Sequence, residues 1–252
     1  IYSQPHPAIR AAEWITAQGL SADSVVLREH WDDALPYSSQ YQVKELPLYD
    51  PETPEKFELI ADRLAEGDYL VLYSSRLYGS IPRLPDRYPQ STRYYKLLLQ
   101  EHLGYQLVHT ETSYPSLPGI VFTNNTFSRP ELPSPKGLTV ARSATFTVDM
   151  GYADDSFVVF DHPKVMIFQN TDRLAKGTLE LLLNQQEMIP EYDQLLMPED
   201  EWVAQQAGGT WREILPPKKL SARFPIPIWF LIIYGISLVA LPLTLTIFRF
   251  LP

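Results

Sequence analysis

The sequence contains no cysteine, and its acidic side chains outnumber its basic ones. The lack of cysteine excludes a disulfide framework and thiol chemistry. With 21 Lys and Arg against 30 Asp and Glu, the formal net charge is −9, which argues against nucleic acid as a partner and against broad contact with anionic lipid. No glycine-rich phosphate loop follows any expected strand, so a dinucleotide site is not expected. A G-x-S-x-G motif is also missing, which argues against a hydrolase.

One long uncharged run closes the chain. Residues 224–248 read FPIPIWFLIIYGISLVALPLTLTIF. As a helix this run would span roughly 35 Å, enough for a bilayer core, and a buried core helix seldom lacks a polar face over such a length. Pro242 inside the run suits a helix with membrane neighbours that accept its freed carbonyl. We therefore expect a transmembrane helix over 224–250, membrane lipid as a partner, and a single-span location in the cell membrane.

The residues before this run alternate helix and strand signals. Helical spacing of apolar residues predicts helices over 7–17, 54–66, 91–102 and 172–183. Short apolar runs predict strands over 24–27, 68–73, 105–110, 144–148, 157–160 and 165–169. Thr53 is typical of a helix start and Gly67 of a helix end.

This alternation predicts an α/β domain over 1–184. Helices between buried strands favour a three-layer, Rossmann-like, mostly parallel sheet with helices on both faces. Residues 114–140 are rich in proline, serine and asparagine, which predicts a long irregular loop. Residues 185–223 are expected to form a polar linker to the membrane.

A dense polar cluster follows the first expected strand: Glu29, His30, Trp31, Asp32 and Asp33. Ligands bind at the carboxyl ends of the strands in parallel sheets. Carboxylates accept protons from sugar hydroxyls and bind hard cations, and an indole face stacks on a pyranose ring. The alternative is a solvated turn in which one of the aspartates caps the backbone.

A second cluster follows the second expected strand, with Ser74, Ser75, Arg76 and Tyr78 and then Arg83, Arg87 and Tyr88. Arginine together with hydroxyl groups suits a phosphate or a polyol. Alternatively, Arg76 or Arg83 pairs with the carboxylates of the first cluster and only braces the loops. Both interpretations predict that the two clusters meet at one edge of the sheet.

His162 lies in an expected turn before the last strand and is a further candidate ligand residue. It could form a metal site with His30 and Asp32, but the spacing is not a metal signature. We therefore assign no metal ligand and no cofactor, and a divalent cation is the one ion that these carboxylates would suit.

Several stretches together resemble one type of bacterial multi-pass membrane protein. They are SQPHPAIRAAEWI, EHWDDALP, ELPLYDPETPEKFELIADRL, DYLVLYSSRLYGSIPRLPDRYPQSTRYYKLL and DHPKVMIFQN. They resemble the soluble domain of glycosyltransferase family 39-like proteins of the dolichyl-phosphate-mannose mannosyltransferase type. The closing stretch IYGISLVALPLTLTIFRFLP resembles the first helix of the membrane domain named for its YYY motif.

The resemblance implies a parent hexosyltransferase with a lipid-linked sugar donor, other transmembrane segments as partners, and an extracytoplasmic domain. The positive-inside rule points the other way, because Arg212, Lys218, Lys219 and Arg223 precede the apolar run. We follow the resemblance, since we expect the chain to be part of a longer protein. The family's catalytic aspartate lies in an early loop without a counterpart here, so no catalytic residue is carried over and this chain alone is not expected to be catalytic.

A non-enzymatic role stays open beside this one. The chain could be a membrane-anchored interaction subunit of a larger envelope or energy-transducing complex. Its docking strands would then be the 114–140 segment and the 185–224 tail.

Overall fold

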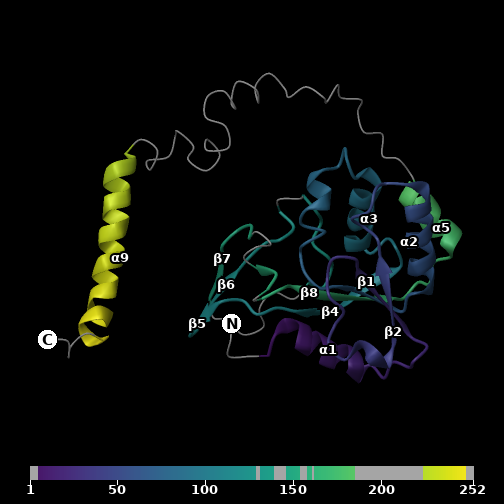
Figure 1. Ribbon diagram of the computed structural model, residues 1–252, viewed down its shortest axis with the longest axis horizontal. Coiled ribbons are helices and arrows are strands. Elements are labelled where there is room, and N and C mark those ends of the chain that lie inside the picture. The colour runs from purple at the N-terminus through teal and green to yellow at the C-terminus, as the bar shows by residue number, and fades with distance from the viewer. Residues whose placement is uncertain are drawn as a thin grey trace, which may run out of the picture. The chain divides into compact units, whose positions relative to one another are not determined.

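The computed structural model describes two compact units, within residues 1–187 and 188–252. The described residues are 5–128, 131–138, 146–153, 158–160, 162–184 and 224–247. The first unit contains an α/β domain with a five-stranded sheet and a small three-stranded sheet (Figure 1). The described residues of the second unit, 224–247, contain one helix.

The main sheet has the strand order β2-β1-β3-β8-β4. Its strands are β1 Val25–Glu29, β2 Gln42–Leu46, β3 Tyr69–Leu72, β4 Tyr105–Glu111 and β8 Val165–Asn170. β1 pairs in parallel with β2 and β3, whereas β8 is antiparallel to both β3 and β4. The sheet is therefore mixed, and the expectation of a mostly parallel sheet was wrong in this respect. A continuous apolar run such as VMIFQ indicates burial on both faces but carries no information on strand direction.

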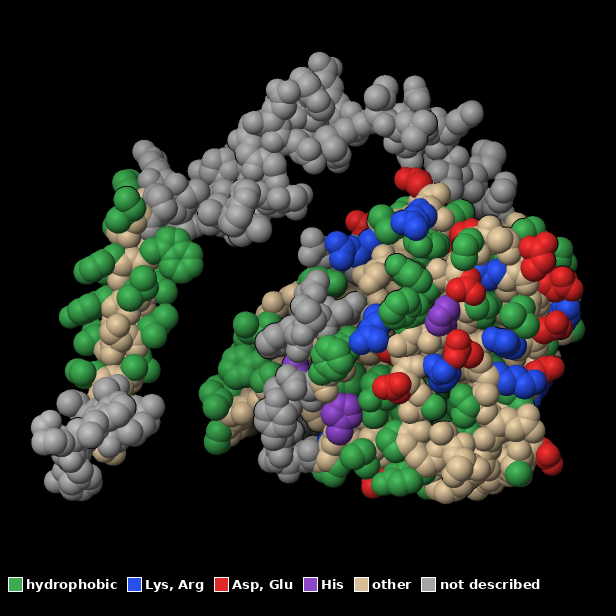
Figure 2. All heavy atoms as spheres, viewed as in Figure 1, with side chains coloured by type: hydrophobic (Ala, Val, Ile, Leu, Met, Phe, Trp, Pro, Cys, Tyr) green, Lys and Arg blue, Asp and Glu red, His purple; other side chains and the backbone are tan. Residues whose placement is uncertain are grey.

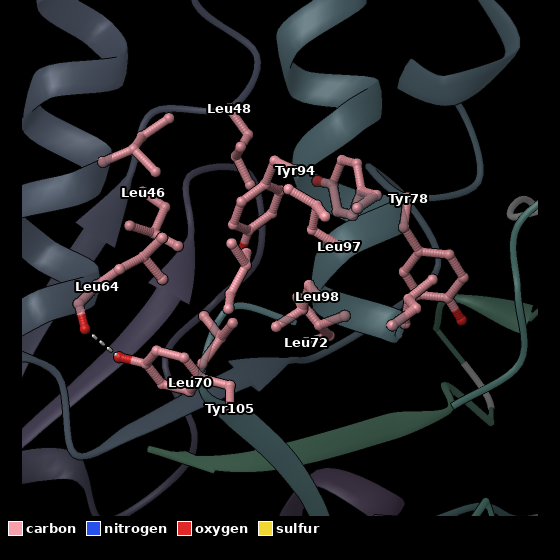
Figure 3. Close-up of a cluster of buried hydrophobic side chains, with 14 of the residues drawn as sticks. Leu46, Leu48, Leu64, Leu70, Leu72, Tyr78, Tyr94, Leu97, Leu98 and Tyr105 are labelled. Carbon is pink, nitrogen blue, oxygen red and sulfur yellow. Dashed lines mark hydrogen bonds between the residues drawn. The ribbon is translucent and has the colours of Figure 1, made fainter. Parts of the chain in front are cut away.

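Helices cover both faces of this sheet, as expected (Figure 1). One face packs on α1 Pro7–Ala17, through Ala8, Ala11, Ala12 and Ile15. The opposite face packs on α2 Pro54–Glu66, α3 Pro89–Leu99 and α5 Lys176–Asn184. Figure 3 shows leucine and tyrosine side chains filling the space between this helical layer and the strands. The alternation along β3 explains both contacts, because Leu70 and Leu72 point to the second face and Val71 to the first.

Local signals fixed the first two helices. α1 and α2 have the predicted bounds, and the Thr53 hydroxyl accepts a hydrogen bond from the Lys56 amide at 3.3 Å. The third helix ends earlier than predicted because Glu101 adopts a φ of +64° two residues after Leu99. Gly67 ends α2 with a φ of −65°, so it is not needed there for a left-handed conformation.

The small sheet consists of β5 Ser116–Leu117, β6 Ile120–Thr123 and β7 Phe146–Asp149, in the order β5-β6-β7. Two of these strands lie inside the predicted irregular loop 114–140, so that prediction was wrong for this part. The apolar run of β6 is only four residues long, and its parallel partner β7 lies far along the sequence. The predicted strand over 157–160 was also wrong, since its described residues 158–160 form a helical turn.

The second unit contains α9 Pro225–Ile247, a helix without acidic or basic side chains in its first or last turn and with Pro242 inside it. Within the described part of the chain, no helix is long and apolar enough to count as a membrane span. The predicted linker 185–223 and the predicted helix end at 248–250 lie outside the described residues.

Candidate functional site

The candidate site lies where the carboxyl ends of β1 and β3 adjoin. After β1 the chain continues to β2, towards one edge of the sheet, and after β3 it continues through α3 to β4, at the opposite edge. Such a reversal of strand order leaves a crevice in which open α/β sheets bind ligands. The segments after the two strands, 30–41 and 73–88, contain most of the predicted site residues.

The two predicted clusters meet, as both interpretations required, through Asp32 and Ser74. The Ser74 hydroxyl lies 2.9 and 3.0 Å from the two carboxylate oxygens of Asp32, and the Ser74 amide donates to Oδ2 at 3.1 Å. Both residues are buried. Both oxygens of this carboxylate therefore have partners, and Asp32 ties the two loops together.

Two arginines hold the backbone of the first loop. Arg28 donates to the carbonyl oxygens of Glu29, at 3.1 Å, and of Asp32, and it pairs with the Glu45 carboxylate at 2.5 Å. Arg76 donates to the Trp31 carbonyl oxygen at 3.0 Å. Arg76 therefore braces the first loop as expected, but it does so through a backbone carbonyl oxygen and not through a carboxylate. These bonds fix the loop in one conformation.

Glu29 is fully enclosed and faces α3. The Tyr95 hydroxyl donates to its Oε1 at 2.5 Å, and among the described residues its Oε2 has no hydrogen-bond partner. Burial raises the pKa of Glu29 well above its usual value, the Asp32 carboxylate adds to this effect, and the Tyr95 hydrogen bond opposes it. A buried carboxyl group of this kind is not available to a ligand at the surface.

Three aromatic rings beside this loop form what we call the aromatic platform: Trp31 and Tyr49, which are exposed, and Tyr88, which is buried and supports Tyr49. The Trp31 and Tyr49 rings meet edge to face at 5.3 Å, and their side chains are 52% and 46% exposed. Tyr49 and Tyr88 lie 6.3 Å apart, and the Arg87 guanidinium lies over Tyr88. Exposed rings that are fixed by their neighbours suit the apolar face of a ligand ring.

Tyr49 was missed by the sequence analysis. It follows β2, whose exposed sequence QVKEL gives only a weak strand signal. Had β2 been recognised, the same rule that selected Trp31 would have selected Tyr49, since both lie just beyond the carboxyl ends of neighbouring parallel strands.

Polar groups flank the platform. His30 stacks on Trp31, and its Nδ1 lies 3.6 Å from the Asp50 carboxylate. Asp33 is exposed but lines a small cavity with Val26, Leu35 and Tyr41, which belong to the core cluster on the α1 side of the sheet. Among the residues that the structure describes, no three carboxylate or imidazole side chains come close enough together to hold a metal ion. The chemistry available at this surface is therefore ring stacking with hydrogen bonding by carboxylate and imidazole groups.

The other predicted residues do not join the platform surface. Tyr78 is buried, its hydroxyl pairs with Thr126 at 3.0 Å and its ring stacks on Phe127. Ser75 and His162 are buried as well, and Arg83 is exposed in the short helix η2 Ile81–Arg83. The Lys164 ammonium also contacts Thr126, at 3.3 Å, and burial lowers its pKa to about 8.

Comparisons with protein-family models, with curated proteins and with solved structures gave no significant match, so functional inference for this chain starts from the site itself.

Proposed function

We propose that this chain is the α/β domain and membrane-attachment region of a membrane glycosyltransferase that uses a lipid-linked sugar, and that its aromatic platform binds a saccharide. The saccharide belongs to the acceptor or to the donor headgroup. The domain faces the extracytoplasmic side and α9 contributes to the attachment, as the resemblance of the sequence implies. The parent protein would supply the catalytic base from another segment.

The observation that carries this proposal is the exposed pair Trp31 and Tyr49, placed at the strand-order reversal and flanked by His30 and Asp50. An indole face covers the apolar face of a pyranose, while Asp50 and His30 lie where they can bond to its hydroxyl groups. The rings are held in place before any ligand arrives, which limits the entropy lost on binding.

A binding role is favoured over a catalytic one by the state of the buried carboxyl groups. Asp32 accepts hydrogen bonds from both the amide and the hydroxyl of Ser74, and Glu29 is enclosed against α3. A general base has to come within hydrogen-bond reach of the proton that it removes. Neither group meets this condition at the surface of the platform.

The test is calorimetric titration of the full chain in detergent with short mannose, glucose and N-acetylglucosamine oligosaccharides. Replacement of either platform ring, Trp31→Ala or Tyr49→Ala, should weaken binding of the preferred oligosaccharide at least about tenfold, or about 1.4 kcal/mol. The matched control is Tyr37→Asn, because Tyr37 is similarly exposed and its φ of +62° suits asparagine. Absence of binding to every oligosaccharide, or equal losses in the control, would contradict the proposal.

The second candidate is the non-enzymatic interaction subunit. Exposed tryptophan and tyrosine side chains are also typical anchors of protein interfaces. If Trp31→Ala abolished co-purification of a membrane partner but the unaltered chain bound no oligosaccharide, this second function would replace the first.

A further inference from the structure

One face of the small sheet is apolar on all three of its strands. The register aligns Leu117 with Ile120 and Ile120 with Phe146, and the next row aligns Phe122 with Val148. Paired residues of neighbouring strands point to the same side of a sheet, and alternate residues of one strand share a face. These five side chains therefore form one surface, which we call the apolar sheet face.

The outer strands of this surface are open to solvent: Phe146 is 66% exposed, Leu117 60% and Val148 40%, whereas Ile120 and Phe122 on the central strand are half-buried. The residues that alternate with them along β5 and β7, which are Ser116, Thr147 and Asp149, are polar. Figure 2 shows hydrophobic side chains gathered at the end of the domain where Figure 1 places β5, β6 and β7.

Such a surface implies a partner. Single exposed apolar side chains are ordinary, but a contiguous group of them marks a contact site. Each apolar Å² removed from water contributes about 25 cal/mol. The five side chains of the apolar sheet face carry no charge and no hydrogen-bonding group, so they offer little that would select a particular protein partner.

The apolar helix α9 indicates what kind of partner this surface meets. The side chains of α9 include many exposed apolar residues, among them Ile226, Phe230, Ile233 and Val239. A helix that is apolar on all sides needs an apolar environment. The chain between the domain and α9, residues 185–223, can extend to at most about 130 Å. A bilayer that takes up α9 is thus always within reach of the domain, at a high effective concentration.

We propose that the apolar sheet face docks on the surface of a lipid bilayer, with Phe146 and Leu117 entering the interface. This docking rests on the membrane attachment that is part of the proposed function. Because the chain has a net charge of −9, the attraction comes from apolar burial and does not need anionic headgroups. Docking should occur on phosphatidylcholine and change little with salt.

The absence of cysteine provides a direct test, since any introduced cysteine is unique. Val148→Cys places a label on the apolar sheet face, and Thr147→Cys places it one residue away on the opposite face. Each full chain is labelled with an environment-sensitive fluorophore and reconstituted in phosphatidylcholine vesicles that contain nitroxide lipids. We expect several-fold stronger quenching at 148 than at 147, in low and high salt alike. Far-UV circular dichroism confirms that both variants are folded.

A third label separates docking from attachment. Ser237→Cys reports whether α9 enters the bilayer. Quenching at 237 with equal, weak quenching at 147 and 148 would overturn the docking and leave the attachment intact. Quenching at 148 without quenching at 237 would support the docking and remove the role of α9. Protection of the 148 label that rises with protein concentration and not with nitroxide lipid would mean that a second copy covers this face, which also overturns the proposal.

Discussion

The Ser74 hydroxyl and amide both donate to the carboxylate of Asp32, across the gap between the loops that follow β3 and β1. The carboxylate is buried and both of its oxygens are used. This contact is the structural support of the candidate site, because it holds the backbone next to Trp31 without involving the exposed ring.

Asp32→Ala should therefore destabilise the domain. The substitution leaves the buried hydroxyl and amide of Ser74 without this acceptor, at about 1–3 kcal/mol for each unsatisfied group. Asp33→Ala is the matched control, since the neighbouring side chain is exposed and its loss should change stability by no more than about 0.5 kcal/mol. Urea unfolding followed by tryptophan fluorescence measures both. Equal effects of the two substitutions would contradict the supporting role of Asp32.

Glu29 should make stability fall as the pH rises. Burial raises the pKa of this carboxyl group in the folded state, so the folded chain binds more protons than the unfolded chain at any pH above about 4.3 and below the folded-state pKa. Glu29→Gln removes this difference. The stability of the variant relative to the unaltered protein should increase as the pH rises from the unfolded-state pKa towards the folded-state pKa of Glu29, as measured by urea unfolding.

Glu111 provides the opposite case. Burial raises its pKa, but the hydrogen bond from His109 and the ion pair with Arg10 outweigh this and lower the pKa overall. Its stabilising contribution is present at neutral pH and is lost as the pH falls through the folded-state pKa. Glu111→Gln should thus destabilise at pH 7 and have little effect in acid. The same pH trend for the Glu29 and Glu111 variants would show that the assigned shifts are wrong.

Gly67 should not tolerate alanine. A Cβ atom there would lie 2.6 Å from the Tyr105 hydroxyl oxygen and 2.7 Å from the Leu27 side chain. The hydroxyl cannot move away easily, because it donates to the Leu64 carbonyl at 2.8 Å (Figure 3). Gly67→Ala should destabilise by about 1–3 kcal/mol. The control is Gly177→Ala in α5, where open space surrounds the glycine, and it should be neutral or stabilise by up to about 1 kcal/mol. Thermal unfolding of both variants measures the difference.

Lys56 should be essential to the packing between α2 and α3. Its ammonium nitrogen lies 2.8–2.9 Å from four oxygen atoms, which belong to the Leu48 and Asp50 carbonyls, the Glu52 carboxylate and the Ser91 hydroxyl, and its three protons are shared among them. Removal of this buried cation by Lys56→Met leaves a carboxylate without its partner and should destabilise by about 3–5 kcal/mol.

The control for this prediction is an exposed ion pair. Lys44 pairs with Glu66 at the surface, so Lys44→Met should destabilise by less than about 1 kcal/mol. Chemical unfolding of the two variants under one set of conditions makes the comparison. A loss below about 1 kcal/mol for both lysines would contradict the role of Lys56.

Sequence reasoning succeeded where the signal was local. α1 and α2 have the predicted bounds because proline at the first turn, the Thr53 cap and a regular apolar spacing all act within one helix. Strand β7 overlaps the predicted strand 144–148, but β2, β5 and β6 were missed, because their short sequences depend on pairing with other strands.

The sequence by itself determined the α/β class, the helices on both faces, and the meeting of the two polar clusters, since burial patterns and strand ends are written in consecutive residues. Only the tertiary structure decided which of the clustered side chains are accessible. Packing buries Glu29, Tyr78 and His162, and a hydrogen bond from Ser74 engages the carboxylate of Asp32. The fold also brings Tyr49 from another loop into contact with Trp31. Sequence position fixes where a side chain begins along the chain, whereas exposure depends on which distant segments pack over it.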